Sequence, residues 1–293
     1  MRALFIGNLT IDMIENRMRI GGSGYYGGRA LTYLDSDVYV LSYVCDEYRG
    51  LVKGVLDLYG IKLIELQCNS MPMFIIEKGK AVKVEGSSCR IDMSIAKIFI
   101  DSYRPDILLL TPILNEIDID QLDVLSSIDV KAIGLDIQGF IRTLRSSRIE
   151  LIWRSELEHY LDLVDIVHGN IAEYSFSRDE KTVLKKIRDL SSTIRTAFLI
   201  SLDYRGTYVV YRNQITYIPA LSVNAIDEVG AGDILLAVTA YYYVQSKDVI
   251  EAAILGVIAA SLKVENPYRE WFDRELIENH FNAITPYIKV VDL

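Results

Sequence analysis

The sequence predicts an α/β protein with a doubly wound, mostly parallel sheet that is flanked by helices and carries a small β lid. Short apolar runs alternate with helix patterns from about residue 90 onward, which is typical of strand–helix–strand units in a parallel sheet. Residues 13–20 and 61–85 carry strand and hairpin signals instead. We therefore expect a single domain over residues 1–293, with these two stretches forming a small sheet inserted in it.

The first part of the chain supplies the opening strands of the large sheet and the lid. Gly7 ends the first apolar run, and a helix pattern over residues 48–59 stops at Gly60, a residue that commonly ends helices. The turn segment Glu77-Lys-Gly-Lys80 indicates a hairpin. A lid of this kind would exclude water from a site beneath it. Strands are expected at residues 3–6, 13–20, 38–44, 61–66, 73–76 and 81–84.

The second part of the chain alternates more regularly. A hairpin around Arg212-Asn213 interrupts the alternation before a glycine-rich stretch opens an apolar helix near residue 230. Strands are expected at residues 107–110, 132–135, 163–167, 197–201, 208–211 and 214–218, and helices at 118–125, 153–160, 179–191 and 248–263.

Composition narrows the class of protein. The formal net charge of −9 argues against a nucleic-acid partner, because phosphate backbones are bound by basic surfaces. No apolar run reaches the length of a membrane span, and the N-terminus begins as a strand instead of a targeting segment. The three cysteines, Cys45, Cys68 and Cys89, show no metal-ligand spacing. We expect them to be reduced thiols in a cytoplasmic protein.

The stretch Asp227-Glu-Val-Gly-Ala-Gly-Asp233 carries the strongest chemical signal. Glycines at a helix start let the backbone approach a ligand, and the free N–H groups of the first turn bind an anion. Asp233 adds a carboxylate beside that anion site, as phosphoryl transfer to a hydroxyl requires. At a helix N-terminus, Asp233 is expected to have a low pKa. A capped helix packed on a sheet is the alternative interpretation.

Other polar residues follow the predicted strands, where a doubly wound sheet gathers its ligand groups. They are Asp12, Gln138, Asn170 and Glu173. The pair Asn170-x-x-Glu173 could orient waters around Mg²⁺, or could simply cap a helix. The dispersed histidines His159, His168 and His280 receive no metal or acid–base role.

A second glycine-rich segment leaves a different class open. Gly22, Gly24 and Gly27 form a G-x-G-x-x-G pattern, which in dinucleotide-binding proteins follows a buried strand. Residues 15–20 are polar for such a strand, so the glycines more plausibly approach a small ligand at a helix start. An NAD(P)-binding oxidoreductase nevertheless remains an alternative.

In this order, the features resemble those of the ribokinase-like (PfkB) family of carbohydrate and nucleoside kinases. Gly230-Ala-Gly-Asp233 with Asp227 is similar to the family's C-terminal signature, and Asn170-x-x-Glu173 to its N-x-x-E motif. Gly21-Gly22 resembles the substrate-side diglycine, and Asp12 the early substrate carboxylate. The resemblance covers the whole chain and implies an ATP-dependent enzyme.

The resemblance also implies roles for individual residues. Asp233 would accept the proton of the substrate hydroxyl, and the backbone of Gly230, Ala231 and Gly232 would form the anion hole. Asn170 and Glu173 would manage Mg²⁺ and phosphate, with Glu173 reaching the metal through water. The acceptor would be held by Asp12, Gly21 and Gly22, and the nucleotide would lie near Ser201, Asp203, Gly206 and Asn224, with residues 260–266 beside the adenine.

The chain departs from the family pattern at Tyr26, Asp203 and Val229. Tyr26 could narrow the acceptor pocket or stack on a ligand ring. The segment Asp136-Ile-Gln-Gly-Phe-Ile-Arg142 is similar to one in a subgroup that includes inositol kinases, which makes Gln138 and Arg142 candidate contacts to substrate or phosphate. We expect a sugar, polyol or nucleoside kinase that can form a homodimer through the lid edge. A catalytically silent sensor on the same fold is a further alternative.

Overall fold

The computed structural model describes residues 1–77, 79–268 and 270–293. Its central feature is a ten-stranded sheet in the order β16-β15-β14-β13-β12-β9-β8-β1-β4-β5. Neighbouring strands from β13 to β5 in this order are parallel. The pairs β13–β14, β14–β15 and β15–β16 are antiparallel. The predicted fold class, a mostly parallel doubly wound sheet, is confirmed.

The strands of this sheet are β1 (Arg2–Ile6), β4 (Asp37–Val44), β5 (Lys62–Gln67), β8 (Ile107–Leu110), β9 (Ala132–Asp136), β12 (Ile166–Asn170), β13 (Ala197–Ser201), β14 (Thr207–Tyr211), β15 (Gln214–Ile218) and β16 (Lys289–Val290). The α-helices are α1 (Ser23–Thr32), α2 (Arg49–Leu58), α3 (Met93–Tyr103), α4 (Gln138–Ile141), α5 (Glu180–Ser191), α6 (Ala231–Ser246), α7 (Val249–Glu265) and α8 (Arg274–Ile284). Short 3₁₀ helices span Ile119–Ser127, Ser155–Leu163, Ile171–Glu173 and Thr285–Tyr287; we had expected α-helices near the first two.

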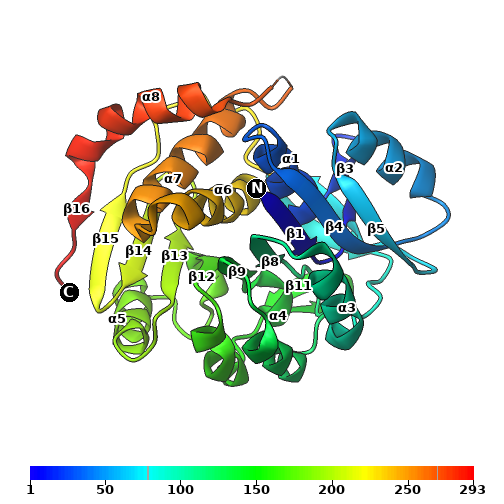
Figure 1. Ribbon diagram of the computed structural model, residues 1–293, viewed down its shortest axis with the longest axis horizontal. Helices are drawn as coiled ribbons and strands as arrows, with labels where there is room; N and C mark the ends of the chain where they lie inside the picture. Colours follow the sequence, from blue (N-terminus) through cyan, green and yellow to red (C-terminus); the bar gives the residue numbers. More distant parts are fainter. Residues whose placement is uncertain (78, 269) are drawn as a thin grey trace.

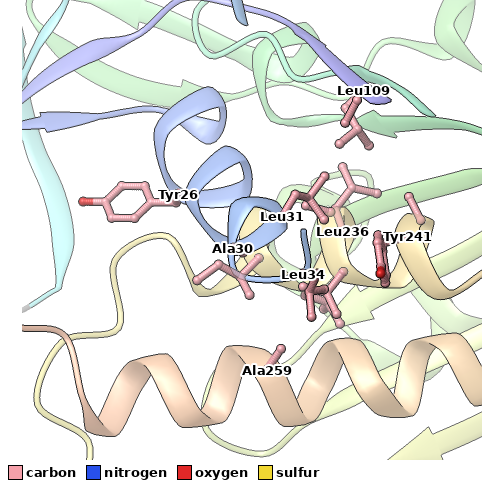
Figure 2. Packing of buried hydrophobic residues seen from close by; sticks show 14 of the residues in the cluster. Tyr26, Ala30, Leu31, Leu34, Leu109, Leu236, Tyr241 and Ala259 are labelled. Atoms are coloured by element: carbon pink, nitrogen blue, oxygen red, sulfur yellow. The ribbon is translucent and has the colours of Figure 1, made fainter. Parts of the chain in front are cut away.

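Helices cover both faces of the sheet (Figure 1). One face packs against α1, α6, α7 and α8, and the other against α3, α5 and the 3₁₀ helices. Helix α6 is apolar on all sides, so it lies between the sheet and α7. Figure 2 shows Leu31 of α1 and Leu34 of the turn after it meeting Leu236 of α6, with Ala259 of α7 alongside. This packing fixes the start of α6 relative to the carboxyl ends of the parallel strands.

A separate four-stranded sheet, which we call the lid, has the order β3-β2-β6-β7. Residues 13–20, expected as one strand, belong to a hairpin whose turn residues Glu15 and Asn16 both have positive φ, as tight hairpin turns require. The predicted hairpin over residues 73–85 is present, although Lys78 in its turn lies outside the described residues. The lid strands are β2 (Thr10–Ile14), β3 (Arg17–Gly21), β6 (Met73–Glu77) and β7 (Lys80–Glu85).

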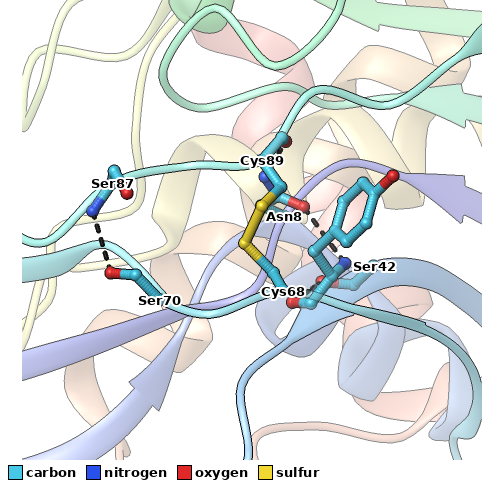
Figure 3. Close-up of a disulfide and its surroundings, with 7 residues drawn as sticks. Asn8, Ser42, Cys68, Ser70, Ser87 and Cys89 are labelled. Atoms are coloured by element: carbon cyan, nitrogen blue, oxygen red, sulfur yellow. Dashed lines mark hydrogen bonds between the residues drawn. A yellow bond between two sulfur atoms is a disulfide. The ribbon is translucent and has the colours of Figure 1, made fainter.

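Two expectations about this region were wrong. The strand at residues 61–66 does not join the lid: β5 pairs in parallel with β4 at the edge of the large sheet, because α2 returns the chain in the same direction. Cys68 and Cys89 are not free thiols but form a disulfide across the base of the β6–β7 hairpin (Figure 3). Their Cα atoms lie 6.2 Å apart, within the usual range for such a bond. Cys45 is a buried free cysteine.

The structure also contains a two-stranded sheet of β10 (Arg142–Arg145) and β11 (Arg148–Leu151), and helix α8, none of which was predicted. Ser146 and Ser147 both have positive φ in the turn between these two strands. The two strands are short and rich in polar residues, so their alternation of apolar and polar side chains gives little indication of a sheet in the sequence. Among the described helices, none is long and apolar enough to cross a membrane.

Candidate active site

The start of α6 combines an open helix end with two glycines that the surrounding side chains require. Gly230, the N-cap, has φ 84°, and a Cβ atom there would lie 2.2 Å from the Tyr26 ring. A Cβ atom on Gly232 would lie 2.6 Å from Cε1 of His168. The first-turn N–H groups of Gly232 and Asp233 are therefore presented by a closely packed backbone, whereas the N–H of Ala231 donates to the carbonyl oxygen of Glu228 at 3.2 Å. Such a helix start favours an anion.

Asp233 lies in the first turn of α6, where it meets residues from two distant segments. Ser23 donates a hydrogen bond from its hydroxyl to Oδ1 of Asp233, and Gln138 Nε2 lies 3.5 Å from the same Ser23 oxygen. Ser23 is buried and was not among the predicted site residues. Its signal in the sequence was its place directly after the diglycine Gly21-Gly22, at the start of α1.

The expected low pKa of Asp233 is wrong. Burial raises its pKa to about 7, and the neighbouring Asp136 carboxylate adds to the increase, while Ser23, His168 and Arg142 oppose it. The loss of hydration outweighs the favourable field of the helix N-terminus. A carboxylate with this pKa is well matched to accept a proton near neutral pH.

A buried histidine–aspartate pair, absent from the predicted site, lies under the anion site. His168 and Asp136 are register partners on the neighbouring strands β12 and β9, and Nδ1 of His168 lies 2.7 Å from Oδ2 of Asp136. The other ring nitrogen lies 3.3 Å from Oγ of Ser201. Burial lowers the pKa of His168, but Asp136, with Glu173 and Asp233, raises it above the ordinary value. Asp136 is the last residue of β9 and His168 lies in the middle of β12, and the available signal was that both follow strands predicted from the sequence.

The predicted phosphate-side residues form one connected group. Arg142 Nη2 lies 3.1 Å from Oε1 of Glu173, whose Oε2 accepts the backbone N–H of Asn170 at 2.9 Å. The Asn170 side chain accepts the N–H of Ala172, which completes a capping box. Its amide nitrogen donates to Asp203 at 2.8 Å. The capping alternative for Asn170 and Glu173 is thus present, together with an ion pair that capping alone does not need.

The other residues predicted to lie near the nucleotide follow the next strands, in the turn between β13 and β14 and in the loop after β15. Asp203 has φ 54°, a left-handed conformation that explains why glycine is common at this position in the family. Gly206 has φ 117°, and a Cβ atom there would lie 2.2 Å from the carbonyl oxygen of Ile218. Asn224 is farther along the chain, with its backbone N–H 3.4 Å from Glu265 at the end of α7.

The acceptor side is built around Asp12, which is 4% exposed. Thr10 Oγ1 donates to Asp12 at 2.9 Å, and the Tyr26 hydroxyl lies 3.4 Å from its other oxygen. Burial raises the pKa of Asp12 to about 6, while Thr10, Arg19 and Tyr26 oppose the increase. A Cβ atom on Gly21 would lie 2.3 Å from this carboxylate, and Gly22 has φ 93°. The diglycine therefore makes room for Asp12.

Tyr26 is 3% exposed, and its ring lies against Gly230 with Trp271 stacked beyond it at 6.4 Å between centroids. The ring therefore forms part of the wall between Asp12 and α6, and its hydroxyl is the part directed at Asp12.

Asp227, in the loop before α6, receives two hydrogen bonds from Arg19 of the lid, at 2.7 and 3.3 Å. Burial opposes its charge, but Arg19 and Lys263 hold the pKa of Asp227 below its usual value.

A helix start suited to an anion, with a carboxylate in its first turn, lies below a lid on a doubly wound sheet, which is the arrangement expected of a small-molecule kinase of the ribokinase-like class. Residues 131–269 match the model of the pfkB family carbohydrate kinases. The chain carries a PfkB family carbohydrate kinase domain.

Curated relatives match over a shorter segment. Sixty-six residues are 38% identical to the deoxyribokinases of Salmonella typhi and Salmonella typhimurium. The aligned segment covers 22% of this chain and 22% of each relative, so the chain spans about a fifth of the curated relatives that it matches.

Solved structures match over nearly the whole chain. A pyrophosphate-dependent kinase in the ribokinase family, complexed with a pyrophosphate analog and myo-inositol, has a TM-score of 0.76 at 18% identity and covers 94% of this chain and 99% of its own. Ribokinase from Thermotoga maritima has a TM-score of 0.71 at 18% identity, with 96% and 99% covered. A Burkholderia thailandensis nucleoside kinase in complex with inosine has a TM-score of 0.73 at 16% identity, with 97% and 98% covered. At these identities the likeness establishes the fold.

Proposed function

We propose that this protein is an ATP-dependent kinase that phosphorylates a hydroxyl group of a small sugar, polyol or nucleoside. The observation that carries the proposal is the position of Asp233, whose carboxylate lies in the first turn of α6 beside the N–H groups of a helix start. The Asp233 carboxylate can accept a proton there, while the neighbouring N–H groups stabilise negative charge. Phosphoryl transfer to a hydroxyl needs both functions at one place.

In this mechanism Asp233 accepts the proton of the acceptor hydroxyl as the oxygen attacks the terminal phosphoryl group. Its pKa of about 7 keeps a large fraction of the carboxylate ionised at neutral pH. The hydrogen bond from Ser23 fixes the orientation of the carboxylate, and Gln138 lies next to Ser23. The open N–H groups of Gly232 and Asp233 would face the charge that develops on the phosphoryl oxygens, since the N–H of Ala231 already donates to Glu228. The lid excludes water, so that the donor is not simply hydrolysed.

The described residues fit Mg²⁺ as an ion carried by the donor. Among them, no group of three or more His, Cys, Asp or Glu residues is arranged to hold a metal ion. Each oxygen of Glu173 takes part in one protein contact, with Arg142 or with the N–H of Asn170, and retains a lone pair for a metal-bound water. Mg²⁺ keeps several waters and few protein ligands. When bound, it would offset the negative charge of the donor phosphates.

The acceptor is proposed to lie between Asp233 and Asp12, with Gly21, Gly22 and Tyr26 forming the wall behind it. Two buried carboxylates suit a ligand with several hydroxyl groups. Within the class we favour a cyclic polyol such as myo-inositol, on the likeness of the segment 136–142 to inositol kinases. Arg142, which pairs with Glu173, lies on the phosphate side of this arrangement. The donor nucleotide would lie along Ser201, Asp203 and Gly206, with residues 260–266 and Asn224 near the adenine.

The test is steady-state turnover with a panel of sugars, polyols and nucleosides, each offered with ATP and with pyrophosphate. Turnover of one acceptor with ATP supports the proposal. Turnover with pyrophosphate and not with ATP would make pyrophosphate the donor, as in the pyrophosphate-dependent kinase among the similar structures. Binding of acceptors without turnover of any pair would instead indicate the catalytically silent sensor.

The oxidoreductase alternative lacks its structural requirement. The strand before Gly22 is β3, a lid strand whose first residues are exposed, and not a buried strand of the large sheet. Nicotinamide cofactor binding without binding of ATP would be needed to restore it.

The assembly and the compartment are also proposals. Strands β3 and β7 are the outer strands of the lid and could pair with a second subunit; sedimentation equilibrium would detect the dimer. We place the protein in the cytoplasm, where ATP is available. Disulfides are unusual there, so the redox state of Cys68 and Cys89 in cell extracts provides a direct check.

A further inference from the structure

Lys263, near the C-terminal end of α7, is a buried lysine beside the proposed anion site. It is 1% exposed. Its ammonium group reaches into the loop of residues 227–229, which leads directly into Gly230. Nζ donates to the carbonyl oxygen of Asp227 at 2.9 Å and to the carbonyl oxygen of Val229, and lies 3.3 Å from Oδ2 of Asp227. The ring centroid of Tyr26 is 5.3 Å away.

This environment matches the needs of a buried ammonium group. Lysine has three donors and no acceptor, and burying its charge is costly unless the donors are used. Here three oxygens from a single three-residue loop surround Nζ, with an aromatic ring behind them. The two carbonyl dipoles point at the same place, so without a cation they would repel each other. The shape of the loop therefore depends on the positive charge at its centre.

The backbone of α7 holds the same loop from the next residue. The carbonyl oxygen of Val264 accepts the N–H groups of Ile226 at 2.9 Å and of Asp227 at 3.1 Å. The loop is thus attached to α7 by a side chain and by the main chain. Its last residue precedes Gly230, so any shift of the loop moves the start of α6. Lys263 therefore acts on the N–H groups of that helix start without touching a ligand.

We propose that Lys263 is a positioning residue whose ammonium group serves as a built-in monovalent cation, organising the loop 227–229 and with it the anion-binding start of α6. The role rests on the proposed function, because it assumes that the start of α6 receives the phosphoryl group. The cage itself is a property of the fold. Backbone carbonyl oxygens are also the ligands that bind K⁺ in ion-selective pores. The oxygens that surround Nζ should therefore accept a free monovalent cation when the side chain is shortened.

The ammonium form of Lys263 persists at neutral pH although burial disfavours it. Burial lowers the pKa of Lys263 to about 8, and Arg19 lowers it further, while Asp227 and Asp233 raise it. Lys263 thus remains mostly protonated at neutral pH.

The experiment compares two substitutions at this position. Lys263→Ala removes the ammonium group and leaves space for an ion, whereas Lys263→Met removes the charge and fills the space. In a buffer whose only salt is tetramethylammonium chloride, we expect both variants to lose about 10- to 100-fold in kcat, the effect of losing charge-assisted hydrogen bonds. Added KCl or NH₄Cl should restore turnover to Lys263→Ala but not to Lys263→Met. The wild type, and the control Lys185→Ala on the exposed face of α5, should not respond to KCl.

A second measurement does not depend on catalysis. In the absence of substrates, the thermal midpoint of Lys263→Ala should rise with KCl and not with tetramethylammonium chloride, and the wild type should show no such difference. If the wild type phosphorylates no acceptor, the proposed function fails, and this melting experiment still decides whether the cage exists. If Lys263→Ala folds only with K⁺, the proposal is supported. Full activity of Lys263→Ala without K⁺, or failure of K⁺ to restore either its stability or its turnover, overturns the proposal.

Discussion

The imidazole of His168 lies directly against Gly232, so that a Cβ atom on this glycine would come within 2.6 Å of Cε1. The ring cannot easily move away, because its nitrogens contact Asp136 at 2.7 Å and Ser201 at 3.3 Å. A real Cβ atom would not approach a ring this closely, so there is no free volume for a side chain at Gly232. The position of the third residue of Gly-Ala-Gly-Asp is therefore limited by a histidine 64 positions earlier in the chain, in the middle of β12.

Gly232→Ala should displace either the start of α6 or the histidine ring. We expect kcat/KM to fall by at least about tenfold, because small misplacements of a catalytic constellation have large effects on rate. Gly50→Ala in α2 is the matched control, since a Cβ atom there has no neighbour within 4 Å. Steady-state kinetics on both variants would check the expectation. Equal activity of the two variants would show that the Gly232–His168 contact is not needed.

Asp233→Asn tests the proposed base. The substitution keeps the size of the side chain and removes its ability to accept a proton, so kcat should fall by at least about 100-fold, the scale of a lost general base. Binding of the donor, measured by calorimetry, should stay close to that of the wild type. Glu251→Gln provides a control, because Glu251 is also an acidic residue in the first turn of a helix, α7. Near-normal turnover of Asp233→Asn would remove Asp233 from the mechanism.

The rate should depend on pH through two carboxyl groups. The base must be ionised, and the pKa of Asp233 in the folded protein is about 7. Below this pH the protonated form accumulates, so kcat/KM should fall by about tenfold for each pH unit. If Asp12, with a pKa of about 6, must also be ionised, the fall should steepen below pH 6.

The pH profile of Asp12→Asn separates the two groups. This variant should show a higher KM for the acceptor and should lose the steeper part of the fall, while the part due to Asp233 remains. The profile should be measured from about pH 5 to about pH 8, which spans the raised pKa values of both groups. A constant kcat/KM over this range would contradict the roles of both carboxylates.

Gly21→Ala tests the acceptor side without changing a charged group. The added methyl group would lie about where the Asp12 carboxylate is now, 2.3 Å from its oxygens, so the carboxylate must move. We expect a higher KM for the acceptor and little change in the KM for the donor. Gly54→Ala in α2 should leave both values unchanged, because its Cβ atom has no neighbour within 4 Å. An unaltered acceptor KM in Gly21→Ala would place the acceptor away from Asp12.

The sequence predicted the large sheet well because its strands are buried on both faces and therefore appear as uninterrupted apolar runs. Residues 107–110 are the clearest case, with all four side chains buried in β8. The edge strand β5 was assigned to the wrong sheet, since its mixed pattern of burial resembles that of a lid strand. The disulfide was missed because 21 positions separate Cys68 and Cys89, and only the folded lid brings them together.

The sequence allows candidate site residues to be named where they follow a strand in a motif, and their roles stay predictions; it does not show contacts with neighbours from elsewhere in the chain. His168 and Asp136 become partners through the register of β9 and β12. The pKa of Asp233 depends on burial and on Asp136, neither of which is visible in the Gly-Ala-Gly-Asp motif. Lys263 appeared only in a predicted helix and in the stretch 260–266 expected beside the adenine, and its contacts depend on a loop 34 to 36 positions earlier.

The Cys68–Cys89 bond closes a covalent ring that contains both strands of the β6–β7 hairpin. A protease that cuts the backbone once anywhere inside this ring cannot separate the two halves of the protein. The nicked chain would migrate as a single species on a denaturing gel without reductant and as two fragments after reduction. Cleavage in the hairpin would thus release the lid strands from each other while β1, β5 and the rest of the large sheet stay joined in one molecule.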